Sequence, residues 1–154
     1  MHHDGTTGVF AREFDALGRW VQIGVASGNV ISVSFPTEPE AESEENAVLD
    51  RIGAYLDGEE DALSHVEVAL TVPTDQRTVL ETVRAIPYGQ AVGVDQVARM
   101  AAGLEDDEGG WEVVERALSA NPVPILIPDH RVVDGPSGAP REVVSKLQSL
   151  EGLA

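Results

Sequence analysis

The stretch from residue 121 to residue 133 is the clearest candidate for chemistry in this chain. It reads Asn-Pro-Val-Pro-Ile-Leu-Ile-Pro-Asp-His-Arg-Val-Val, so that Asp129, His130 and Arg131 interrupt an otherwise apolar run. Each proline fixes one backbone torsion, and three of them stiffen the approach to the polar residues. Charged or titratable groups inside an apolar run need partners, which predicts a polar site. A buried Asp–Arg or Asp–His pair that only holds a turn together is an equally good explanation.

The elements expected around this stretch are mostly helical. Apolar residues recur at helical spacing in four segments, 74–86, 95–102, 111–118 and 141–150. Thr74, which follows Pro73, is the expected N-cap of the first helix. The short apolar runs 125–127 and 131–133 are candidate strands. This order of helices, short strands and a last helix is typical of a winged-helix type of helix-turn-helix domain.

The first 72 residues have a different pattern. Residues 20–25 and 30–35 alternate apolar and polar side chains around the turn Ser27-Gly28-Asn29, which predicts a β-hairpin. Further on, residues 46–56 have helical spacing and residues 66–72 resemble another strand. We therefore expect an α/β (α+β) protein with a small N-terminal α/β domain over residues 1–72 and a helix-turn-helix domain over residues 73–154.

Charge is the unusual feature of the composition. The chain has 154 residues, with 27 acidic residues against 10 basic ones and a net charge of −17, and Lys146 is its single lysine. Such a surface repels a polyanion at moderate salt, unless molar salt screens the repulsion. Acidic proteins with almost no lysine are common in salt-loving organisms, so we expect adaptation to high salt.

Other features of the sequence limit the kinds of site and the cellular location that we expect. The chain has no cysteine, which excludes disulfides, thiolate metal sites and a cysteine nucleophile. It has no apolar run of about 18 residues and no signal-peptide pattern at its start, so we expect no membrane association and a cytoplasmic location. We also expect a monomer that needs no metal and no cofactor.

Three motifs resemble the O6-alkylguanine-DNA alkyltransferases, also called methylated-DNA–protein-cysteine methyltransferases. Their signature Asn-Pro-x-Pro-x-x-x-Pro-Cys-His-Arg-Val matches residues 121–132, with Asp129 in the place of the reactive cysteine. The segments Ile86-Pro87-Tyr88-Gly89 and Leu150-Glu151-Gly152 match two further family motifs. The resemblance covers about residues 73–152 well, whereas the first 72 residues fit the small N-terminal domain of the family only in outline.

The resemblance implies a one-way alkyl transfer from DNA to protein. In the family a damaged guanine is flipped out of the duplex and a thiolate takes its O6-alkyl group. A histidine activates the cysteine through water, and a glutamate orients that histidine. By position, His130 matches the histidine, Glu151 the glutamate, and Asn121 the asparagine that braces the active-site turn.

This chain departs from the family at several functional positions. Asp129 is a much weaker nucleophile than a thiolate. The tyrosine that rotates the nucleotide is replaced by Val94, and Glu112 stands where an arginine fills the vacated base stack. The small recognition-helix face includes Glu115, which would repel phosphate, and the guanine loop is shortened to residues 137–139. The DNA-binding positions implied by the resemblance are Val94, Glu112, Val113, Val114 and Arg131.

Three functional hypotheses follow. The first is a non-catalytic relative of the alkyltransferases that serves as a scaffold for an unknown protein partner, and the second is a DNA-binding sensor of O6-alkylguanine. The third is a different enzyme that uses Asp129, His130 and Glu151 as a hydrolytic or metal-binding set, although adjacent residues rarely point at one metal ion. Arg131 could have a structural role, as the partner of Asp129 or another nearby carboxylate, in place of a catalytic one. Whether the protein is an enzyme at all stays open, and the family reaction is not expected.

Overall fold

The structure, a computed structural model, describes residues 7–41 and 43–153. The chain divides into two compact units, residues 1–69 and 70–154. Within the described residues, a three-stranded antiparallel sheet is combined with five α-helices, which confirms the mixed α/β class. None of the described helices has both the length and the apolar composition that a bilayer crossing requires.

The first unit is built on strands β1 (Gly8–Phe14), β2 (Arg19–Ala26) and β3 (Asn29–Ser34) in the order β1-β2-β3. The hairpin expected from the sequence is confirmed as β2 and β3. Its turn residues Ser27 and Gly28 both have positive φ, 51° and 81°, as the tight turns that match strand twist require. Strand β2 turns alternate side chains, Val21, Ile23 and Val25, into the core.

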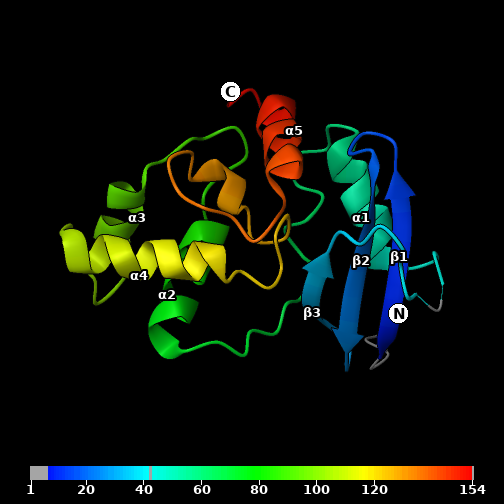
Figure 1. Cartoon of the computed structure of the whole chain (residues 1–154), viewed down its shortest axis with the longest axis horizontal. Helices are drawn as coiled ribbons and strands as arrows, with labels where there is room; N and C mark the ends of the chain where they lie inside the picture. The colour runs from blue at the N-terminus through cyan, green and yellow to red at the C-terminus, as the bar shows by residue number, and fades with distance from the viewer. Residues whose placement is uncertain (1–6, 42, 154) are drawn as a thin grey trace. The chain divides into compact units, whose positions relative to one another are not determined.

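Helix α1 (Ala47–Leu56) lies beside the sheet in Figure 1 and contacts β1. It begins after Asn46, whose Oδ1 accepts the backbone N–H groups of Val48 and Leu49 at 2.7 and 3.3 Å. This side-chain cap satisfies donors that the helix itself leaves unpaired. The helix expected over residues 46–56 is thus confirmed, and its apolar face is buried.

Two expectations for the first unit need correction. Strand β1 was not among the predicted strands, although it pairs with β2 along its whole length. Residues 66–72 were expected as a strand, but they form only an isolated bridge between Val30 and Val68. The pairing there consists of two bonds, Val30 N–H to Glu67 O at 2.9 Å and Ala69 N–H to Val30 O at 3.0 Å. An alternating pattern shows only that one face is buried, and it does not supply a partner strand.

The second unit contains α2 (Thr74–Arg84), α3 (Val94–Met100), α4 (Glu108–Ser119), a single 3₁₀ turn η1 (Asp129–Arg131) and α5 (Arg141–Glu151). All four predicted helices are confirmed. Helix α4 contacts both α2 and α3, and Figure 1 shows it lying across them. Thr74 is not the cap of α2, because Pro73 occupies that position and makes no side-chain cap.

The runs 125–127 and 131–133 were expected as strands, and this expectation is wrong. Within the described part of the second unit, they take part only in isolated bridges, Pro124 with Ile127 and Val92 with Val132. Prolines have no backbone N–H to donate to a ladder, and three of them surround the first run. No β wing of a winged helix is therefore seen among these residues.

Two adjacent glycines at the start of α4 differ sharply in their surroundings. A Cβ on Gly110 would lie 1.9 Å from the carbonyl oxygen of Glu105, whereas one on Gly109 would meet nothing nearer than 3.6 Å. We expect Gly110→Ala to lower the free energy of unfolding by about 1–3 kcal/mol. Gly109→Ala should leave it unchanged or raise it by up to about 1 kcal/mol. Urea unfolding of both variants at one salt concentration checks this, and equal effects would contradict the close approach.

Candidate functional site

The proline-rich segment after α4 folds into a tight, buried turn braced by Asn121. The side-chain Nδ2 of Asn121 donates to Ile127 O at 3.1 Å, and its Oδ1 accepts the Val123 N–H at 3.0 Å. Within the turn, Ile125 has φ of +76° although it is β-branched and 2% exposed. A left-handed conformation at such a residue costs on the order of 1–3 kcal/mol and persists only where its surroundings impose it. The Asn121 brace is part of what imposes it.

Asp129 lies at the end of this turn, and donors surround its carboxylate. Its Oδ1 accepts the hydroxyl of Ser137 at 2.6 Å, and its Oδ2 accepts Asn121 Nδ2 at 3.0 Å and the Gly138 N–H at 2.8 Å. The residue is only 2% exposed. A Cβ on Gly138 would lie 2.3 Å from Asn121 O, so the loop at 137–139 approaches this closely only with glycine. Both carboxylate oxygens are therefore engaged inside the protein.

Burial raises the pKa of Asp129 above its usual value, because removal from water disfavours the charged form. The hydrogen bonds from Ser137, Gly138 and Asn121, and the proximity of His130, act in the opposite direction and lower the pKa in part. The fold thus removes the Asp129 carboxylate from water and gives it three hydrogen-bond donors from the protein instead.

The raised pKa of Asp129 predicts a pH-dependent difference between the protein and its Asp129→Asn variant. An acid whose pKa is raised on folding stabilises the fold at low pH, and this contribution is lost as pH rises from the unfolded value of about 3.9 through the folded pKa. Asparagine does not titrate and can donate to Ser137 in place of accepting from it. We therefore expect the variant to gain stability relative to the protein across that pH range, which urea unfolding at several pH values measures. A constant or opposite difference would contradict the raised pKa.

Glu151, at the end of α5, is the second buried carboxylate of the site. Its side chain is 0% exposed and lies 2.7 Å from His130 Nε2. Arg131 donates to it from Nε at 2.8 Å and from Nη2 at 3.0 Å, and Gly89 N–H donates at 2.9 Å. The carboxylate thereby ties α5 to the η1 turn and to the loop after α2.

Arg131 is fixed on three sides. Besides its paired contact with Glu151, its Nη1 donates to Ile86 O at 2.6 Å, and its guanidinium lies 5.6 Å from the centre of the Tyr88 ring. The sequence left Asp129 and another nearby carboxylate as candidate partners of Arg131. In the structure Arg131 pairs with Glu151 and not with Asp129. Arg131 therefore has a packing role inside the protein, and its fork geometry suits a bidentate carboxylate contact.

The structure brings the four predicted site residues together in two pairs. Asn121 bonds directly to Asp129, and His130 bonds to Glu151. Across residues 7–41 and 43–153, no three His, Asp or Glu side chains converge as metal ligands would. The metal-binding form of the third hypothesis consequently has no support in this geometry.

The predicted DNA-binding positions are placed less favourably. Val114 is 0% exposed and belongs to the core, and Val94 and Arg131 are each 8% exposed. These three side chains are buried within the protein, so they add little to its surface. On α4, Glu112 and Glu115 are exposed and Val113 is half-buried. The exposed residues of this helix therefore include two carboxylates beside the exposed Arg116.

Sequence reasoning also missed several residues. Trp111 is the first residue of the apolar pattern over residues 111–118, yet it is 37% exposed and its Nε1 donates to Asp106 at 2.8 Å. Asp134 accepts the Val94 N–H at 2.8 Å and so fixes the start of α3. Ser137 and Gly138 were identified only as a shortened loop. A buried aspartate must be given donors, and a Ser-Gly pair eight residues later was the available signal.

Comparison of the sequence with known proteins identifies a matching family and several relatives. The sequence model of the family described as 6-O-methylguanine DNA methyltransferase, DNA binding domain, matches residues 74–150, half of the chain. A methylated-DNA–protein-cysteine methyltransferase of Methanothermobacter thermautotrophicus is 34% identical over 118 residues, and the match covers 70% of this chain and 61% of that protein. The corresponding protein of Archaeoglobus fulgidus is 28% identical over 114 residues, covering 74% and 73% of the two chains.

Solved structures show the same fold. The O6-methylguanine methyltransferase of Mycobacterium tuberculosis aligns with a TM-score of 0.73 at 19% identity, covering 96% of this chain and 92% of that one. The same bacterium's protein solved in complex with DNA gives a TM-score of 0.72 at 20% identity, covering 94% and 91%. With the family match over residues 74–150 and the motif around Asp129, the chain belongs to the 6-O-methylguanine DNA methyltransferase family, as a member without any cysteine.

Proposed function

We propose that this protein does not transfer alkyl groups and acts as a non-catalytic member of its family. The observation that carries the proposal is the state of Asp129, which stands in the position of the reactive cysteine with both oxygens hydrogen-bonded and 2% exposed. Alkyl transfer needs an accessible nucleophile with a free electron pair. A carboxylate is a weaker nucleophile than a thiolate, and this one is also shielded.

The loop at residues 137–139 supports the same proposal. By resemblance, this loop would contact the flipped guanine, yet its Ser137 hydroxyl and Gly138 N–H donate to Asp129. An incoming base would have to displace these hydrogen bonds before it could make its own. Base flipping already costs a few kcal/mol that new contacts must offset. A pocket whose donors are engaged internally is poorly suited to provide them.

A second candidate function is the sensing of O6-alkylguanine in DNA without repair. The match of residues 74–150 to a DNA-binding domain favours it, as does the similarity to a structure solved with DNA. The exposed Glu112 and Glu115 on α4 argue against it, because carboxylates facing phosphates weaken binding unless salt screens them strongly.

One assay separates the two functions. The protein is incubated in molar KCl with a duplex labelled on the methyl group of O6-methylguanine, and with the same duplex lacking the lesion. We expect no label on the protein and no preference for the lesion. Selective retention of the lesion duplex would establish the sensor, and label on the protein would overturn the non-catalytic proposal. The cysteine-containing relative from Methanothermobacter thermautotrophicus serves as the positive control.

Restoring the nucleophile alone should not restore repair. We expect Asp129→Cys to transfer at most a small fraction of the label, because Val94 and Glu112 still replace the residues that support base flipping in the family. The same labelled duplex measures this, and urea unfolding of the variant shows whether it remains folded. Transfer at the level of the cysteine-containing relative would show that the loss of cysteine is the single functional difference.

The setting of the protein is also proposed from composition. A net charge of −17 with a single lysine supports an environment of high salt, where self-repulsion is screened. Stability that rises from dilute to molar KCl would agree with this, and stability that falls would contradict it. A cytoplasmic, monomeric protein with a protein partner remains our expectation for the non-catalytic role.

A further inference from the structure

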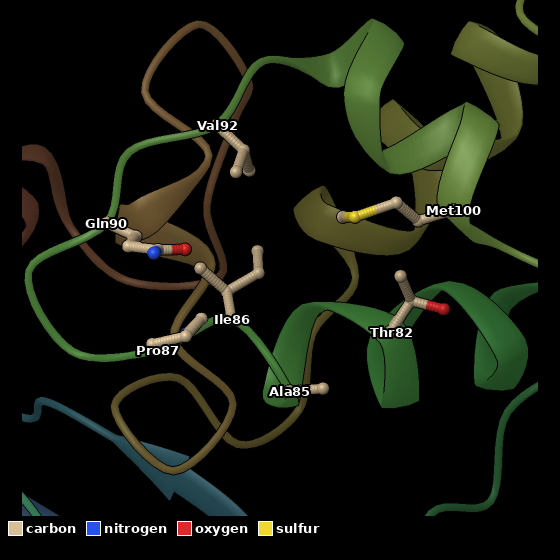
Figure 2. A pocket seen from close by; sticks show the side chains of 7 residues that line it. All are labelled: Thr82, Ala85, Ile86, Pro87, Gln90, Val92 and Met100. Atoms are coloured by element: carbon tan, nitrogen blue, oxygen red, sulfur yellow. The ribbon is translucent and has the colours of Figure 1, made fainter.

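A cavity of about 340 Å³ lies in the second unit, between the end of α2, the loop after it and the end of α3. Figure 2 shows it from close by, with the side chains of Ala85, Ile86 and Pro87 on one side and Met100 extending from α3 on the other. Its volume is near the lower end of the range, about 300–1,000 Å³, that small-molecule sites occupy. None of the site residues Asp129, His130 and Glu151 lines it, so the cavity adjoins the site described above without including these side chains. The full lining is Thr82, Ala85, Ile86, Pro87, Gln90, Val92 and Met100.

The lining of the cavity is uncharged, although the chain as a whole is strongly acidic. Charged residues make up 24% of the sequence and the net charge is −17, yet no lining residue is charged. A charged ligand would lose its hydration there without gaining an opposite charge. Met100 is 53% exposed although it is apolar, and its thioether faces the cavity in Figure 2. Methionine sulfur makes favourable contacts with aromatic rings.

Two side chains give the cavity polar character. Figure 2 shows the amide of Gln90 extending from the loop into the space. An amide offers one acceptor oxygen beside N–H donors, and it can pair side by side with another amide-like edge. The hydroxyl of Thr82 donates to Thr78 O at 2.8 Å, which leaves it only an acceptor for a ligand.

The cavity walls are fixed by the buried site. Ile86, which is 4% exposed, accepts Arg131 Nη1 through its carbonyl at 2.6 Å. Val92 donates its N–H to Arg131 O at 2.9 Å and accepts the Val133 N–H at 3.0 Å. The apolar surface is thus held in place before a ligand arrives, and less conformational freedom is lost on binding.

We propose that this cavity binds a small, uncharged aromatic molecule that carries a carboxamide-like edge. The ring lies between Met100 and the apolar wall of Ile86 and Pro87, and the edge pairs with the Gln90 amide. Size, absence of charge, the exposed thioether and the inward amide together select this ligand class.

Nuclear magnetic resonance of methyl-labelled methionine tests the proposal on the full chain. Met1 and Met100 are the only methionines, so Met100→Leu assigns the Met100 methyl signal directly. The probes are benzamide, benzoate and toluene, which share a ring and differ in the edge. We expect benzamide to shift the Met100 signal with a dissociation constant on the order of millimolar, as a fragment of this size allows. Benzoate should bind at least about tenfold more weakly, the cost of desolvating its charge.

Two variants make the result specific. Ala85→Trp, which fills the cavity from its rim, should abolish the shift, whereas Ala102→Trp, at an exposed position outside the lining, should not. Gln90→Leu should weaken benzamide about tenfold and leave toluene unchanged or tighter, since only the amide pairing is lost. The proposal is overturned if benzamide gives no shift, if benzoate binds equally well, if toluene binds more tightly than benzamide, or if Gln90→Leu has no effect.

Discussion

Replacing Glu151 by glutamine is expected to lower the free energy of unfolding by about 3–5 kcal/mol, the usual cost of removing one partner from a buried ion pair. The change preserves shape and removes charge, so that Arg131 is left buried at the site without its counter-ion. It also replaces one acceptor oxygen with an NH₂ donor. Because Gly89 N–H and Arg131 both donate to this side chain, one of these donors would then face another donor. Urea unfolding at a fixed, molar KCl concentration measures the loss.

Two comparisons make this result interpretable. Glu59→Gln removes the charge from a half-exposed pair with Arg51 and should cost less than about 1 kcal/mol. Combining Glu151→Gln with Arg131→Met should recover much of the loss, since an apolar replacement of a buried pair is often neutral. If Glu151→Gln costs no more than Glu59→Gln, the carboxylate does not hold α5 to the turn.

The same contacts explain why Glu151 can persist in a chain without a cysteine nucleophile. In the family, by resemblance, the pair of His130 and Glu151 serves the reactive cysteine. Here Glu151 also accepts Arg131 and Gly89, so its removal would disrupt three segments at once. Stability alone is a sufficient reason to retain Glu151, and the presence of this carboxylate is no argument for catalysis.

The helices were predictable because each carries a local signal. Asn46 caps α1, and the apolar residues of α2, α4 and α5 repeat at helical spacing. Strands were harder, since a strand exists only with a partner. Residues 66–72 have the right alternation and find one bridge, whereas β1 has a weaker pattern and pairs fully with β2.

The residues of the candidate site were predictable, but their partners were not. The motif identified Asn121, Asp129, His130 and Glu151 by resemblance. The sequence left open which carboxylate Arg131 would pair with, because Asp129 is two residues away and Glu151 is twenty residues away in the chain. Only the fold of α5 back onto the η1 turn decides between them. The donors to Asp129 likewise come from a loop whose close approach depends on Gly138.

Asn121→Asp should be as damaging as Glu151→Gln at neutral pH, with a loss of about 3–5 kcal/mol. Asn121 Nδ2 donates to Asp129 Oδ2 at 3.0 Å and to Ile127 O at 3.1 Å. The variant replaces this donor with a second buried carboxylate, and two carboxylates at that distance cannot both ionise. Chemical unfolding as a function of pH measures the effect.

The pH dependence distinguishes charge repulsion from poor packing in this variant. The carboxyl pair would share one proton with a pKa raised above the unfolded value of about 3.9, so the loss should shrink as pH falls toward that value and grow as it rises. Combining Asn121→Asp with Asp129→Asn leaves one carboxylate, which removes the repulsion between two charges, so the dependence of the loss on pH should weaken. A loss in the single variant that is independent of pH would contradict the close approach of residues 121 and 129 inside the protein. The internal engagement of the Asp129 oxygens, on which the non-catalytic proposal depends, would then have to be abandoned.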